Sequence, residues 1–206
     1  MPAHPWLDFA KRVQALAQAG LTYAENDYDL ERYQELSEIS VAILADLTDE
    51  EVPKIKELFT NEIGYQTPKT DVRAVVFREG KILMVREKID NCWSLPGGWA
   101  DVGFTPGEVA VKETREEAGL EVKATKILAV LDKKCHPHPP SPYHTYKIFI
   151  LCEEVGGSLQ QGSETLAVEY FDRAELPDLS TERGTVSQVQ LMFEFLDNPL
   201  KETVFD

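Results

Sequence analysis

The hydrophobic pattern of the chain changes its period near residue 70, and this change constrains the fold more than any other feature. Before that point, apolar side chains recur at three- and four-residue steps, which is typical of helices with one buried face. From Asp71 onward, apolar and polar positions alternate in short runs, which is typical of half-buried strands. Residues 64–70 contain a glycine and a proline and predict a linker. We therefore expect a helical N-terminal domain over residues 1–66 and a second domain over residues 67–206.

The first domain carries two apolar stripes, which predict a pair of helices. One stripe stops near Gly20, a residue type that often follows the last turn of a helix. The other follows an acidic start near Asp29, and Thr48 with Glu51 then resembles a capping box that opens a third helix. About sixty residues bury only a limited core alone, so both stripes need a covering surface: other helices, the second domain or a second subunit. The stripes consist of Trp6, Phe9, Val13, Leu16 and Ala17, and of Leu36, Ile39, Ile43, Leu44 and Leu47.

The second domain mixes strand-like runs with two helical stretches. Residues 79–80 predict a hairpin turn, and Gly156-Gly157 predicts a loop. Thr185 and Gln188 resemble a capping box at the start of a last helix. This order of elements indicates an α/β domain with a mixed sheet. Strands are expected over residues 72–77, 82–85, 93–95, 122–131, 146–152 and 166–171, and a helix over residues 107–118.

The composition argues against several classes of protein. With a net charge of −15, the chain lacks the basic surface by which proteins bind the phosphates of nucleic acids. No apolar run approaches the roughly 20 residues of a membrane span, and the N-terminus does not resemble a signal peptide. We therefore expect a cytoplasmic protein with no membrane partner. Cys92, Cys135 and Cys152 are far apart, which suggests neither a disulfide framework nor a zinc site.

Residues 97–120 carry the most informative polar pattern. Thr105 and Pro106 suit the start of a helix, and a glycine suits its end. At about 100° per residue, three glutamates share one face of this helix, and no cation is expected between them. Like charges at this spacing repel each other, and a divalent cation relieves the repulsion. Glu108 and Lys112 are expected to pair on another face. A solvated acidic surface is the alternative interpretation of the glutamates, which are Glu113, Glu116 and Glu117.

The stretch GGWADVGFTPGEVAVKETREEAGL resembles the Nudix box. Gly98, the three glutamates, Gly119 and Leu120 stand at the spacing of that motif, and the Leu-Pro-Gly before it also fits the family. Three positions depart from it: Phe104 replaces a glutamate, Lys112 replaces an arginine, and Thr114 replaces an aliphatic residue. In the family, the glutamate and the arginine commonly support one another, so their joint replacement is less disruptive than the loss of one.

A helical extension followed by GGWADVG is similar to a bacterial subfamily that acts on X-linked nucleoside diphosphates. The resemblance implies a Nudix α/β/α sandwich and metal-dependent hydrolysis of the diphosphate bond. ADP-ribose, cleaved to AMP and ribose 5-phosphate, is the expected substrate, with CDP-choline as the main alternative. A nucleotide-sensing module without catalysis and a hydrolase of oxidised nucleoside triphosphates are alternative functions. Because such enzymes are often homodimers, we predict that the helical domain helps to form a homodimer interface.

The same resemblance implies a metal site and several catalytic candidates. Mg²⁺ or Mn²⁺ would be held by Glu113, Glu116 and Glu117 and by the carbonyl of Gly97. The ion would neutralise the diphosphate and lower the pKa of the attacking water. Glu164, in a loop before a late strand, is the candidate general base, and an ordinary loop carboxylate is the alternative reading of it.

Candidate substrate contacts lie on strands and in one proline-rich loop. Arg73 and Arg86 lie on predicted strands and are candidates for paired hydrogen bonds to phosphate, with surface ion pairing as the alternative. Trp99 follows the Gly-Gly turn and is a candidate for stacking on a base. His136 and Tyr143, in the loop rich in proline and histidine, are further candidates for facing the substrate, with a solvated edge and metal ligation by the histidines as alternatives.

Overall fold

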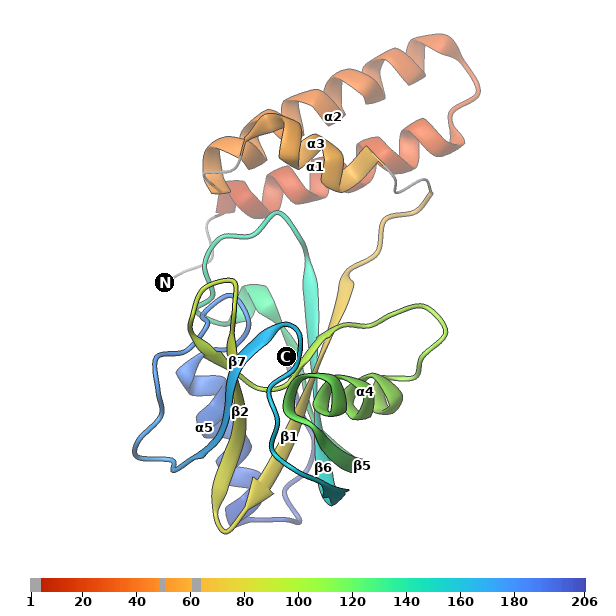
Figure 1. Ribbon diagram of the computed structural model, residues 1–206. Coiled ribbons are helices and arrows are strands. Elements are labelled where there is room, and N and C mark those ends of the chain that lie inside the picture. The colour runs from red at the N-terminus through yellow and green to blue at the C-terminus, as the bar shows by residue number, and fades with distance from the viewer. Residues whose placement is uncertain (1–4, 49–50, 61–63) are drawn as a thin grey trace. The chain divides into compact units, whose positions relative to one another are not determined.

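The computed structural model describes residues 5–48, 51–60 and 64–206, with only the backbone described for 58–60 (Figure 1). The chain divides into two compact units. The helical unit contains the chain up to Pro68 together with Pro139–His144, and the sheet unit contains Lys69–His138 and Thr145–Asp206. The sequence pattern did not indicate that Pro139–His144 belongs with the helices. Among the described helices, none is long and apolar enough to cross a membrane.

The helical unit contains α1 (Pro5–Tyr23), α2 (Asp27–Thr48) and α3 (Val52–Thr60). The prediction that α1 ends at Gly20 is wrong, because the helix continues to Tyr23. A Cβ at position 20 would collide with the ring of Tyr33 on α2. This glycine therefore permits close packing of α1 against α2 and does not end the helix.

The apolar stripes predicted for α1 and α2 are mostly not the faces that the helical unit buries. Trp6 is 64% exposed and Leu16 is 66% exposed, and of the two stripes only Ala17 and Leu44 are buried. Small side chains lie in the contact between α1 and α2 together with larger ones, and the Ser40 hydroxyl donates to the Ala10 carbonyl at 2.9 Å. Small residues at these positions let the two helices approach each other closely. The core consists of Leu7, Ala10, Val41, Leu44, Ala45 and Ile55.

The sheet unit is built around a mixed sheet. Its central strand β1 pairs parallel with β6 and antiparallel with β2 and β4, while β5 pairs antiparallel with β6 and parallel with β8. The strand order is β3-β2-β1-β6-β5-β8, and β7 pairs with β2. The predicted mixed sheet is therefore confirmed. The strands are β1 (Lys69–Arg78), β2 (Lys81–Glu87), β3 (Trp93–Ser94), β4 (Gly97–Trp99), β5 (Leu120–Asp132), β6 (Thr145–Gly157), β7 (Thr165–Phe171) and β8 (Val204–Phe205).

One helix covers each face of this sheet (Figure 1). Alternate residues of β1 point to opposite faces, so Val72 and Ala74 pack with α4 (Pro106–Ala118). Val75 packs with α5 (Val186–Asp197). The predicted α/β/α sandwich after a helical N-terminal region is confirmed.

The prediction of a loop at Gly156-Gly157 is wrong, since both residues continue β6 and pair with the start of β5. Gly157 has a φ of 84°, and a Cβ there would lie 2.5 Å from the carbonyl oxygen of Gly119. The glycine therefore marks a close approach of two backbones at the end of α4.

Candidate active site

The helix that carries the glutamates begins and ends as its sequence predicts. Thr105 caps α4: its hydroxyl accepts from the backbone N–H of Glu108, and the Glu108 carboxylate accepts from the Thr105 N–H at 2.8 Å. Pro106 occupies the first turn, and Gly119 ends the helix with a φ of 71°. Among the ion pairs of the described residues, the predicted pair between Glu108 and Lys112 is absent. The Glu108 carboxylate instead accepts hydrogen bonds from the N–H and the hydroxyl of the capping residue Thr105.

Glu117 is the buried member of the acidic face, with 7% of its surface exposed. Its Oε2 accepts a hydrogen bond from the backbone N–H of Gly97 at 2.9 Å. Burial raises the pKa of Glu117 to about 8, and the charges of Glu87 and Glu113 act in the same direction. A carboxylate in this environment favours a cation at its free oxygen, because a cation offsets the penalty of burying the charge.

The prediction that no cation lies between the glutamates is wrong. The Nζ of Lys112 lies 2.8 Å from Oε1 of Glu113 and 3.1 Å from Oε2 of Glu116. It is also 3.7 Å from Oδ2 of Asp101. Hydrogen bonds to Glu113 and then to Glu116 raise the pKa of Lys112. The long lysine side chain reaches two carboxylates that helical spacing alone assigns to another face.

A glycine turn lies against the acidic face. Gly97 has a φ of 139°, and a Cβ there would collide with the carbonyl of Val72 on the neighbouring strand. An ideal Cβ on Gly98 would lie 3.8 Å from Oε2 of Glu113. Only Gly97 therefore requires glycine, whereas a Cβ on Gly98 would be in ordinary contact with Glu113.

The donor set suits a hard divalent cation. Three carboxylates close together in one helix provide the oxygen ligands that Mg²⁺ and Mn²⁺ prefer. Among the described residues, no three His, Cys, Asp or Glu side chains are grouped so as to hold a metal ion. Lys112 and the Gly97 N–H hold the three carboxylates instead. The residue types fit a divalent ion in their chemistry, whereas their side chains as described are not gathered around one point.

The loop that carries Glu164 is fixed to the end of α4. The hydroxyl of Thr165 donates to the carbonyl of Glu117 at 2.9 Å, and the N–H of Lys88 donates to the carbonyl of Glu164 at 3.1 Å. The side chain of Glu164 is exposed. The structure thus brings this loop to the acidic helix, while the role of Glu164 stays a prediction.

The two arginines of the predicted site have different surroundings. Arg73 is only 5% exposed; its Nε and Nη2 bind Asp71 at 3.0 and 2.9 Å, and its Nη1 donates to the Leu95 carbonyl. Lys147, which is also buried, pairs with the same aspartate. Arg86 is half-buried, and its Nε donates to the Asn91 carbonyl across the hairpin. Arg73 therefore belongs to a buried ion cluster and not to the surface.

The remaining candidates are scattered. Trp99 is half exposed at the end of β4, directly after the glycine turn. His136 lies 3.0 Å from Asp206 through its Nε2. Tyr143 belongs to the helical unit, where its carbonyl accepts from Lys11. The structure therefore places Trp99 at the end of β4, a strand that contacts α4, whereas the contacts of His136 and Tyr143 lie at the C-terminus and in the helical unit.

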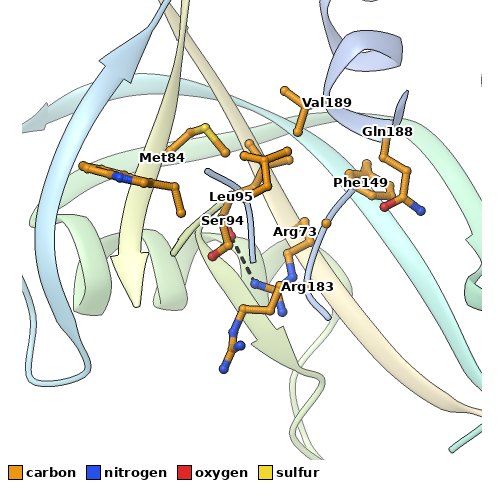
Figure 2. Close-up of a pocket in the computed structure, with 11 residues that line it drawn as sticks. Arg73, Met84, Ser94, Leu95, Phe149, Arg183, Gln188 and Val189 are labelled. Atoms are coloured by element: carbon orange, nitrogen blue, oxygen red, sulfur yellow. Dashed lines mark hydrogen bonds between the residues drawn. The ribbon is translucent and has the colours of Figure 1, made fainter. Parts of the chain in front are cut away.

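A hollow on the α5 side of the sheet contains residues that the sequence analysis did not select (Figure 2). Arg183 comes from the loop between β7 and α5, and Gln188, chosen only as a helix cap, comes from the first turn of α5. These residues join Arg73 only in the folded chain, so no local sequence signal could have found them. The hollow is lined by Arg73, Met84, Trp93, Ser94, Leu95, Phe149, Leu179, Arg183, Gly184, Gln188 and Val189.

Comparison with known protein families gives two matches along the chain. Residues 67–191 match the family described as NUDIX domain. Residues 4–59 match a family described as UDP-X-like, N-terminal oligomerisation domain. Together they account for both units of the fold.

Individual relatives agree with these matches. A putative ADP-ribose pyrophosphatase of Bacillus subtilis is 48% identical over 201 residues, which are 98% of this chain and 97% of the relative. The crystal structure of an ADP-ribose pyrophosphatase from Streptococcus suis is 44% identical, with a TM-score of 0.62, over 68% of this chain and 100% of that chain. The crystal structure of a UDP-X diphosphatase is 29% identical, with a TM-score of 0.65, over 100% of both chains.

Proposed function

Because the chain belongs to the Nudix hydrolases, we propose that it hydrolyses the diphosphate bond of a nucleoside diphosphate linked to a second group, X. The expected first substrate is ADP-ribose, with AMP and ribose 5-phosphate as products. The observation that carries this proposal is α4, which holds Glu113, Glu116 and Glu117 beside the buried turn at Gly97. Two relatives that bear the name ADP-ribose pyrophosphatase support the choice of substrate.

Nudix enzymes generally need a divalent metal ion. We propose Mg²⁺ or Mn²⁺, with Glu113, Glu116, Glu117 and the carbonyl of Gly97 as its ligands. When bound, the ion supplies positive charge to the diphosphate and lowers the pKa of the attacking water. The Gly97 N–H fixes one oxygen of Glu117, which leaves the other oxygen for the ion.

The other proposed roles concern proton transfer and substrate binding. Glu164 accepts the proton of the attacking water, and its loop is fixed to α4 by Thr165. Trp99, exposed beside the glycine turn, stacks on a ring of the substrate. Arg73 contributes positive charge from within its buried cluster. Arg86, His136 and Tyr143 stay candidate contacts.

A UDP-linked substrate is the second candidate. The structure named UDP-X diphosphatase covers the whole chain, and the N-terminal match carries a UDP-X-like description. CDP-choline remains a further alternative for the same chemistry. All three proposals share the bond that breaks and differ in the base and in X.

We also infer that the helical unit joins two copies of the chain into a homodimer. Its exposed large apolar side chains include Trp6, Phe9 and Leu16, which helical spacing places on one face of α1, and Ile39 on α2. Large apolar side chains grouped on one face commonly mark a protein interface. The name of the matching N-terminal family, an oligomerisation domain, supports this inference.

A substrate panel with product analysis tests the proposed activity. The panel contains ADP-ribose, a UDP-sugar, CDP-choline, NADH, diadenosine polyphosphates and nucleoside triphosphates, each with Mg²⁺ and with Mn²⁺. We expect a nucleoside monophosphate and a phosphorylated X from the X-linked substrates, and no turnover in excess chelator. Release of pyrophosphate from triphosphates alone would show that the substrate class is wrong. Binding without turnover of any substrate would indicate a sensor.

A further inference from the structure

A diphosphate substrate must approach a strongly acidic site, so fixed cations with free donors are needed there. Three buried or half-buried cations of the sheet unit already have partners. Lys112 binds Glu113 and Glu116, and Lys147 is buried against Asp71. Arg73 directs its Nε and Nη2 to Asp71 and its Nη1 to a carbonyl.

Arg183 differs from these cations because part of its guanidinium is free. Its Nε lies 3.1 Å from Oε1 of Glu87, and its Nη1 lies 3.1 Å from the Ser180 hydroxyl and 3.6 Å from Oδ2 of Asp90. Among the described residues, none is a hydrogen-bond or ion-pair partner of its Nη2. The side chain is 26% exposed, so solvent and ligands can reach it. It lines the same hollow as Arg73 (Figure 2).

The loop that carries Arg183 is firmly attached to the sheet. The N–H of Ser180 donates to the Trp93 carbonyl at 2.8 Å, and the Trp93 N–H donates to the Asp178 carbonyl at 2.9 Å. The Ser180 hydroxyl also donates to Asp90 at 2.5 Å. An arginine on such a loop loses little freedom when it binds a ligand, which favours its use in recognition.

Glu87 connects Arg183 to the acidic helix. This carboxylate is buried at the end of β2 and accepts from the Ser94 hydroxyl at 2.6 Å as well as from Arg183. Its charge is close enough to Glu117 to raise the pKa of that residue. Glu87 also pairs in the sheet with Thr165, whose hydroxyl donates to the Glu117 carbonyl, so Arg183 is connected through Glu87 to the end of α4.

We propose that Arg183 binds the substrate diphosphate, by donating its free Nη2 edge to a non-bridging phosphate oxygen, and that Glu87 is the residue that positions it. This inference rests on the proposed function. A guanidinium suits the task because its planar donors match phosphate oxygens and keep their charge at every relevant pH. The competing explanation is that Arg183 only neutralises the buried charge of Glu87.

The test compares substitutions at both positions in the full-length chain. Binding of α,β-methylene-ADP is measured by calorimetry with Mg²⁺ present, and kcat and KM are measured with the substrate that turns over. We expect Arg183→Met to weaken analogue binding about 10- to 100-fold, the range for a lost charge-assisted hydrogen bond, and to leave adenosine binding unchanged. Arg183→Lys should weaken analogue binding less. Arg173→Met, which removes an exposed arginine paired with Asp197, is the matched control and should have no effect.

The background of Glu87→Gln separates the two explanations, because it removes the charge that Arg183 would otherwise only neutralise. Because glutamine at position 87 keeps an oxygen that can accept from Arg183 and so position it, Arg183→Met should still weaken analogue binding at least 10-fold in this background. If the loss disappears there, or if adenosine binding falls equally, the role of Arg183 is structural and the proposal is wrong. A wild-type chain that binds the analogue but cleaves no X-linked diphosphate would contradict the proposed function and leave this binding role standing.

Discussion

The two units of the chain use their apolar residues in opposite ways. In the sheet unit, the residues of β1 are buried on both faces, although their alternation is typical of a half-buried strand. In the helical unit, the side chains that define the predicted stripes, such as Trp6 and Leu16, are largely exposed. The buried contact between α1 and α2 is made by smaller residues such as Ala10 and Ser40. In the proposed dimer, hydrophobic periodicity marks a surface that is buried between subunits and not in the core of one unit.

The largest expected effect is in the sheet unit, at the acidic helix. Glu117→Gln should lower kcat by at least ~10²-fold, the lower range for loss of a positioned catalytic group, because the amide cannot replace the carboxylate toward a metal ion. Steady-state kinetics and light scattering check that activity falls while the oligomeric state is unchanged. Glu153→Gln, at an exposed position on β6, is the control. Near-normal turnover of the Glu117 variant would show that the acidic face is a solvated surface and not a catalytic site.

The next effect is in the helical unit. Leu16→Glu should raise the dissociation constant of the dimer about 10- to 100-fold, since it places a charge where an apolar side chain becomes buried. Sedimentation velocity over a concentration series measures this constant. Gln34→Glu adds a charge at an exposed polar position of α2 and should leave the dimer intact. If the Leu16 variant associates as tightly as the wild-type chain, another surface forms the interface.

A smaller effect concerns the stability of the sheet unit in acid. Burial lowers the pKa of His138 to about 4, although its hydrogen bond to the Thr181 carbonyl acts in the opposite direction. Unfolded histidine has a pKa near 6.5, so between about pH 6.5 and 4 the unfolded chain binds a proton that the folded chain does not. The contribution of His138 to the free energy of unfolding should therefore be fully present above pH 6.5. It should fall by up to about 2 kcal/mol as the pH drops to 4.

Urea unfolding of the wild-type chain and of His138→Gln at several pH values isolates this contribution. The difference in unfolding free energy between the two proteins should shrink or reverse toward pH 4. A difference that stays constant across the pH range would show that His138 titrates normally in the folded chain.

The smallest expected effect is at Lys112. Lys112→Met should strengthen Mn²⁺ binding about two- to fivefold, because the lysine no longer competes for Glu113 and Glu116, and exposed ion pairs are individually weak. Electron paramagnetic resonance of free Mn²⁺ measures the affinity without reference to turnover. Lys123→Met, on β5 and exposed, is the control. Weaker Mn²⁺ binding would instead mean that Lys112 positions the glutamates for the ion.

Local features of the fold were predictable because local chemistry determines them. The caps at Thr105, Gly119 and Thr185 follow from residues close in sequence, and the structure has all three. The predictions of a loop at Gly156-Gly157 and of a helix end at Gly20 are wrong for the same reason. At both places a glycine permits contact with a segment distant in sequence, and a local reading cannot distinguish that from a turn.

The candidate site also combines features that the sequence predicts with features that only the folded chain brings together. The spacing of Glu113, Glu116 and Glu117 on one helix was readable from the sequence, as was the glycine turn beside them. The cluster of Glu87 with Arg183 joins residues nearly a hundred positions apart, so it becomes visible only after folding. The contact of the Lys112 ammonium group with Glu113 depends on the length of the lysine side chain. The angle between residues around the helix axis does not take that length into account.

The position of the segment Pro139–His144 restricts how the helical unit and the sheet unit can change independently during evolution. It connects β5 to β6, yet it belongs with the helices, where Lys11 donates to the carbonyl of Tyr143. The N-terminal part is therefore not an appendage that recombination can exchange at a single joint. A gene fusion that replaced only residues 1–66 would leave this connection without its native contacts. We expect the helices and this connecting segment to change together in descent, so that substitutions on α1 are matched by substitutions within residues 139–144.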